Sequence, residues 1–96
     1  MLSLALALLG AQGAAEEMVI TGRQQPLRIG ITRDSGRRVG ACEIVQSSGD
    51  AVFDRLSCET AAACSREEDR SLKAVQACTQ TVMAATDRDL SGSNSQ

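Results

Sequence analysis

The chain has 96 residues, with 10 basic and 12 acidic side chains, no histidine and one aromatic residue, Phe53. A net charge of −2 with intermixed signs gives no basic surface for nucleic acid, and the lack of histidine removes imidazole as metal ligand or general base. We therefore expect no catalytic residue, cofactor, metal or small-molecule substrate. One small domain with light aliphatic side chains needs further stabilisation, such as disulfides.

Residues 1–15 are rich in Leu and Ala and carry no charged side chain. The apolar run is too short to span a bilayer, which takes about 20 residues, but it fits the central region of a secretory signal. Gly13-Ala14-Ala15 offers the small residues that a signal peptidase requires, although no Lys or Arg precedes the run. We expect cleavage after Ala15 and a periplasmic protein. A mis-assigned start codon and an inner-membrane-associated tail are the alternatives.

The segment 16–26 is predicted to be extended. Val19, Ile20 and Thr21 favour a strand, and Gly22 ends the run. From the residues alone the segment can be an edge strand or a flexible tail.

Residues 27–45 are predicted to form a β-hairpin. Leu27, Ile29 and Ile31 alternate with polar or small residues, which is the pattern of a strand with one buried face. The turn residues at 34–36 then reverse the chain.

The second strand of this hairpin changes its apolar parity. Val39 cannot share a face with Cys42 and Ile44 in a regular strand, because one position is odd and the others are even. We predict a β-bulge at Gly40, which lets all three side chains face the core.

Two helices are predicted after the hairpin. Ser48 or Asp50 can cap the first, which begins at Ala51 and is anchored by Phe53. For the second helix, Ser65 and Glu68 have the spacing of a capping box. Its apolar stripe consists of Leu72, Val75, Cys78, Val82 and Ala85. We expect this helix to end near residue 88, so that the domain spans 27–88 and 89–96 forms a disordered tail.

The four cysteines form an even set, as expected of disulfides in an exported protein. Cys58 and Cys64 are six residues apart, about 240° around a helix, so they should not bridge each other. We favour the pairs Cys42–Cys58 and Cys64–Cys78. Four buried free thiols in a cytosolic protein are the alternative. A zinc site is disfavoured because the cysteines lack the close spacing of a metal knuckle.

The stretch 27–62 resembles the C-terminal domain of TonB-type energy transducers, in which a hairpin strand ends in Ser-Ser-Gly and leads into a helix. The matching positions are Gly36, Val39, Cys42, Ile44, Ser47-Ser48-Gly49, Phe53-Asp54 and Cys58. Some members of that family carry cysteines at the positions of Cys42 and Cys58. The resemblance implies a binding function without catalysis.

The segment 16–22 is similar to the TonB box of outer-membrane receptors, where an acidic residue precedes a short β-branched run. The resemblance implies that Met18, Val19, Ile20 and Thr21 form a strand that pairs with a hairpin edge, in this chain or in a partner. The chain departs from the transducers in having a single proline, and hence no Pro-rich spacer. A helix also stands where the family has its third strand, and no membrane anchor is expected.

The sequence thus predicts an α+β fold, in which a small hairpin, with or without an extra N-terminal strand, packs against two helices and is held by disulfides. The expected function is protein interaction in the periplasm or at the outer membrane, near TonB-dependent transport, with a homo-oligomer as an option. The alternatives are an exported structural or envelope protein unrelated to TonB, and a redox-active thiol protein.

Overall fold

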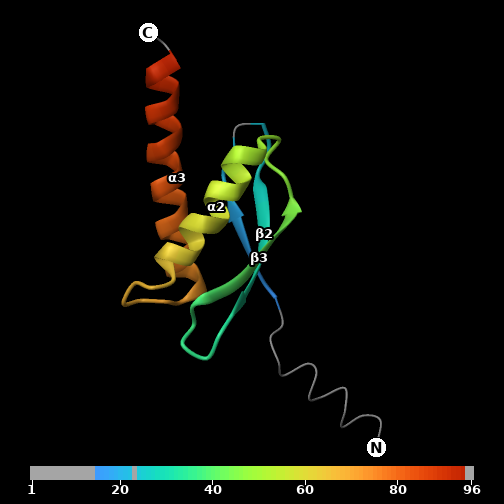
Figure 1. Ribbon diagram of the computed structural model, residues 1–96, viewed down its shortest axis with the longest axis vertical. Coiled ribbons are helices and arrows are strands. Elements are labelled where there is room, and N and C mark those ends of the chain that lie inside the picture. The colour runs from blue at the N-terminus through green and yellow to red at the C-terminus, as the bar shows by residue number, and fades with distance from the viewer. Residues whose placement is uncertain (1–14, 23, 95–96) are drawn as a thin grey trace, which may run out of the picture.

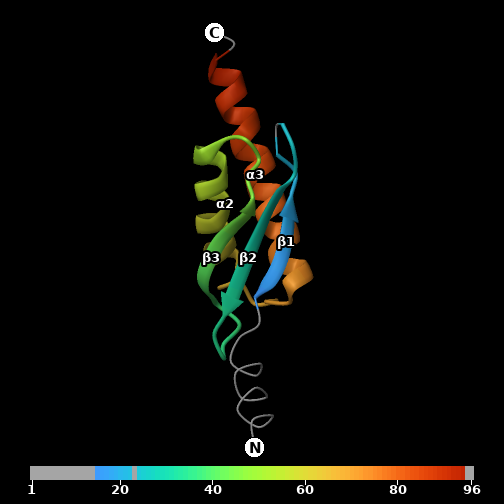
Figure 2. The same ribbon diagram turned by 90° about the vertical axis from the view of Figure 1, so that its right-hand side faces the viewer.

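The computed structural model describes residues 15–22 and 24–94, with side chains up to Arg88. Within this range the chain forms a three-stranded antiparallel sheet with two helices on one face, which confirms the predicted α+β class (Figure 1). Figure 2 looks onto the other face of the sheet, which no helix covers. The elements are β1 (Glu16–Ile20), β2 (Leu27–Arg33), β3 (Val39–Gln46), α2 (Ala51–Cys64) and α3 (Leu72–Asn94).

β1 is an integral strand of the sheet, whose order is β1-β2-β3. It pairs antiparallel with β2, so that Met18 lies opposite Ile29 and Ile20 lies opposite Leu27. All four of these side chains are 0% exposed. The edge-strand interpretation of this segment is therefore confirmed, since alternate β1 side chains are part of the core.

The predicted bulge in β3 is present. Thr32 pairs with Ala41 and Arg33 pairs with Val39, which leaves Gly40 as the extra residue. Val39 and Cys42 pack against the core as expected.

Ile44 does not follow this prediction, because its side chain is 42% exposed. It lies opposite the fully buried Ile29, and paired residues share a face of the sheet. Ile44 belongs to β3, an outer strand of the sheet, none of whose residues is buried.

α2 begins after Asp50, whose carboxylate accepts hydrogen bonds from the amides of Val52 and Phe53. The predicted anchor Phe53 is buried. Phe53, Ser57, Ala61 and Cys64 form the buried face of α2, together with Asp54 near its start.

Ser65 has a different role from the predicted capping box. Its amide donates to the carbonyl of Ala61 and its hydroxyl to that of Ala62, so Ser65 ends α2. α3 begins at Leu72, seven residues after the predicted cap, and the hydroxyl of Ser71 accepts from the amide of Ala74. A bend at 66–70 separates the helices, and the last two carbonyls of α2, those of Ala63 and Cys64, accept from the amides of Arg66 and Glu67.

The buried face of α3 differs from the predicted stripe. Val75, Thr79 and Met83 are buried, whereas Val82 and Ala85 are exposed. Residues at steps of four follow one line of contact along α3, and that line is set by where α2 and β1 lie.

α3 also runs past its predicted end near Arg88 and continues to Asn94. The prediction of a disordered tail is thus corrected for residues 89–94, while 95–96 lie outside the described range. Ser, Gly and Asn weaken a helix by only about 0.5–1 kcal/mol per residue, so an established helix can extend through them.

Both predicted disulfides are confirmed. Cys42 of β3 bridges Cys58 of α2, and Cys64 at the end of α2 bridges Cys78 of α3. The first ties a strand to a helix and the second joins the helices, and no described cysteine is free.

Candidate partner-binding edge

The outer edge of β1 is closed by two glutamines of α3. The amide of Val19 donates to Oε1 of Gln76 at 2.9 Å, and the amide of Thr21 donates to Oε1 of Gln80 at 2.7 Å. Residues four apart on a helix are about 6 Å apart along its axis, and residues two apart on a strand are about 6.6 Å apart. The two glutamines therefore match the spacing of successive outward amides on the strand.

Two ion pairs join β1 to β2. Arg33 donates to both carboxylate oxygens of Glu16, at 2.7 and 3.0 Å, and to the carbonyl of Arg70 before α3. Arg28 pairs with Glu17 on the uncovered face. These contacts fix the start of β1 against both β2 and the segment that leads into α3.

β3 forms the opposite edge, and none of its residues is buried. Its first amide, that of Val39, donates to Oγ of Ser65 at 3.0 Å. Over Gly40–Gln46, no side chain in the described part of the molecule accepts from a backbone amide. Ile44 and Val45 are also 42% and 52% exposed.

The strand register identifies the open amides of β3. Successive backbone amides of a strand point to opposite sides of it. The amides of Val19 and Thr21 point away from β2, and the pairing of each strand with its neighbour carries this alternation across the sheet to β3. It follows that the amides of Cys42 and Ile44 point away from β2. They form a short open stretch to which an extended segment can pair.

The loop between β3 and α2 is built around Asp54. Its carboxylate accepts from the hydroxyl of Ser47, and from both the amide (3.1 Å) and the hydroxyl (2.6 Å) of Ser48. Burial would raise the pKa of Asp54, but these hydrogen bonds outweigh it and hold the pKa below its ordinary value. Gly49 completes the loop with a φ of +96°, which favours glycine.

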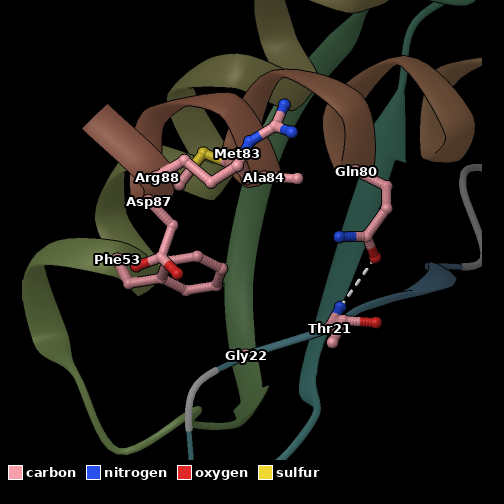
Figure 3. Close-up of a pocket in the computed structure, with 8 residues that line it drawn as sticks. All are labelled: Thr21, Gly22, Phe53, Gln80, Met83, Ala84, Asp87 and Arg88. Atoms are coloured by element: carbon pink, nitrogen blue, oxygen red, sulfur yellow. Dashed lines mark hydrogen bonds between the residues drawn. The ribbon is translucent and has the colours of Figure 1, made fainter. Parts of the chain in front are cut away.

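A cavity of about 330 Å³ lies where the end of β1 meets α2 and α3 (Figure 3). Phe53 and Met83 supply apolar surface, and the bond from Thr21 to Gln80 crosses one side. The lining residues are Thr21, Gly22, Phe53, Gln80, Met83, Ala84, Asp87 and Arg88. The cavity thus adjoins the capped end of β1.

The disulfides fit a protein of an oxidising, extracellular or periplasmic compartment. None of the described helices is long and apolar enough to cross a membrane. The signal peptide predicted for residues 1–15 lies outside the described residues, apart from Ala15.

The structure uses the predicted partner strand within the chain itself. Met18, Val19 and Ile20 lie in β1, and Thr21 follows directly. The sequence did not single out Gln76 and Gln80. Their four-residue spacing on a predicted helix was the available signal, but surface glutamines at this spacing are common and only the packing of α3 on β1 gives them a role.

Comparison of the chain with protein-family models, curated proteins and solved structures found no match.

Proposed function

We propose that the chain is a small periplasmic protein-interaction module, exported by a cleaved signal peptide, that acts without catalysis near TonB-dependent transport. It resembles part of a TonB C-terminal domain. The open stretch of β3 at Cys42–Ile44 is the observation that carries the proposal. Its outward amides and the exposed Ile44 suit addition of an extended partner segment.

The resemblance to the transducers supports the choice of the β3 edge as the binding edge. In that family a third strand follows the helix, whereas here α3 follows α2 and packs against α2 and β1 instead. β3 is therefore left as an outer strand. A protein from the periplasm or the outer membrane that contributes a short β-branched segment is the partner we propose.

Photo-crosslinking at matched positions tests this proposal. A photoreactive residue replaces either Ile44 on β3 or Val82 on α3, two side chains that are each 42% exposed. In cells that make the protein, we expect residue 44 to capture a component of TonB-dependent uptake and residue 82 to capture none. Equal capture from both positions, or none from residue 44, contradicts the proposal.

The second candidate is an exported structural protein unrelated to TonB, and the arrangement of the disulfides favours it. They link β3 to α2 and α2 to α3 around a core of mostly aliphatic side chains. In that case neither position captures a partner, and reduction of the disulfides causes a large loss of thermal stability.

A further inference from the structure

We propose that Gln76 and Gln80 prevent a second copy of this chain from pairing along the edge of β1. This inference goes beyond the proposed function and does not depend on it. It concerns β1, whereas the proposed partner binds β3. The two glutamines are called the glutamine cover below.

Without the glutamine cover, the edge of β1 is complementary to itself. Two β1 strands that meet antiparallel with Val19 opposite Val19 place Glu17 opposite Thr21, so no like charges face each other. The outward backbone groups of Glu17, Val19 and Thr21 then fall in register for hydrogen bonding. Val19 is 45% exposed, which adds an apolar contact at the centre.

The glutamine cover blocks this pairing by occupying the donors that it needs. Two of the three outward amides, those of Val19 and Thr21, already donate to α3. A second copy would have to break both bonds and displace both side chains. Only the amide of Glu17 is left in each copy, so a symmetric pair would keep two backbone hydrogen bonds, one donated by each chain, which is too few to hold two strands together.

The packing of α3 holds the glutamine cover in place. Val75, Thr79 and Met83 on the same helix are buried in the core. Gln76 and Gln80 each follow one of these buried residues, so their backbone positions are fixed by the packing of the helix. Edge strands left unprotected are recurrent sites of self-association.

A pair of double variants tests the proposal. Gln76→Met with Gln80→Met keeps helix propensity and side-chain length but removes both acceptors. Gln76→Glu with Gln80→Glu keeps an acceptor oxygen at each position. Sedimentation velocity over a concentration series reports association, and amide hydrogen exchange in dilute solution reports the amides of Val19 and Thr21.

At high concentration we expect the Met variant to form larger assemblies than the wild type, because two copies can then pair along the edge of β1. In dilute solution its amides at Val19 and Thr21 should exchange at least tenfold faster. The Glu variant should match the wild type in both measurements. Single Gln80→Met should speed exchange at Thr21 and leave Val19 protected, a local effect that general loss of structure would not give.

Three outcomes overturn the proposal. The first is a Met variant that shows the wild-type association state at every concentration. The second is unchanged exchange at Val19 and Thr21. The third is a Glu variant that associates like the Met variant, because the retained acceptors should preserve the cover. Crosslinking from residue 44 is independent of all three, so failure here leaves the proposed β3 function standing.

Discussion

The carboxylate of Asp54 in α2 accepts hydrogen bonds from both the amide and the hydroxyl of Ser48, six residues earlier in the chain. Ser47 adds a third hydrogen bond, and Gly49 supplies the left-handed turn that brings the serines back over the helix. The Ser-Ser-Gly motif and the aspartate after Phe53 therefore form one structural unit. This unit sets where α2 starts relative to the end of β3.

The first prediction concerns acid stability. Because the pKa of Asp54 is below its ordinary value of 3.8 in the folded protein, its ionised form stabilises the fold above about pH 4. That contribution is lost as the pH falls through the lower, folded-state pKa. We expect Asp54→Asn to reduce the free energy of unfolding by about 2 kcal/mol at pH 7.

Urea unfolding of the wild type and Asp54→Asn between pH 2 and 7, with disulfides intact, measures this difference. The gap between the two proteins should narrow below about pH 4, since protonated Asp54 loses the same interaction. A gap that stays constant down to pH 2 would falsify the assignment of the acid sensitivity to Asp54.

The second prediction concerns the disulfides. They close loops of similar length, with sequence separations of 16 and 14 residues. Replacing either pair by alanine should therefore lower the free energy of unfolding by about 3 kcal/mol. Thermal or urea unfolding of Cys42→Ala/Cys58→Ala and of Cys64→Ala/Cys78→Ala gives the two values.

The two disulfide variants should differ in local dynamics. Loss of Cys42–Cys58 should speed amide exchange in β3, because β3 has no buried residue and this bond is the covalent link between the middle of the strand and α2. Loss of Cys64–Cys78 should leave β3 protected and affect the junction of the helices. Identical exchange patterns for the two variants would contradict this division.

The third prediction compares two buried serines. The hydroxyl of Ser57 is fully buried and has no hydrogen-bond partner, whereas that of Ser48 donates to Asp54. Removing an unsatisfied buried hydroxyl costs nothing in hydrogen bonding. Ser57→Ala should thus leave the free energy of unfolding unchanged or raise it by up to about 1 kcal/mol.

Ser48→Ala is the matched control and should lower the free energy of unfolding by about 1–2 kcal/mol, because Asp54 loses a donor. Chemical denaturation of both variants at pH 7 measures the contrast. Equal losses from Ser48→Ala and Ser57→Ala would show that Ser57 has a partner in solution.

The strands could be predicted because their signals are local. The alternation at Leu27, Ile29 and Ile31 can be recognised within one strand, and the parity change at Gly40 within the next. Helical periodicity argued only against a Cys58–Cys64 bridge, so the sequence favoured the observed pairs without fixing them, and the structure decided the pairing. The end of α3 could not be placed, because Ser, Gly and Asn are tolerated in a helix that packing has already established.

The candidate site was less predictable than the fold. Ile44 has the sequence pattern of a core residue, but its exposure depends on how far the helices extend over β3. Which side of α3 faces the core, here the side with Val75 and Met83, likewise depends on where the helix crosses the sheet. Neither the extent of the helices over β3 nor the position of α3 on the sheet is encoded within a single helix or strand.

The sequence by itself determined a disulfide-linked hairpin with helices, since strand alternation, turn residues and cysteine spacing act over short distances along the chain. Only the tertiary structure decided which edge of the sheet is open. Gln76 and Gln80 meet Val19 and Thr21 across separations of 57 and 59 residues. Contacts of that range exist only once α3 has packed against β1.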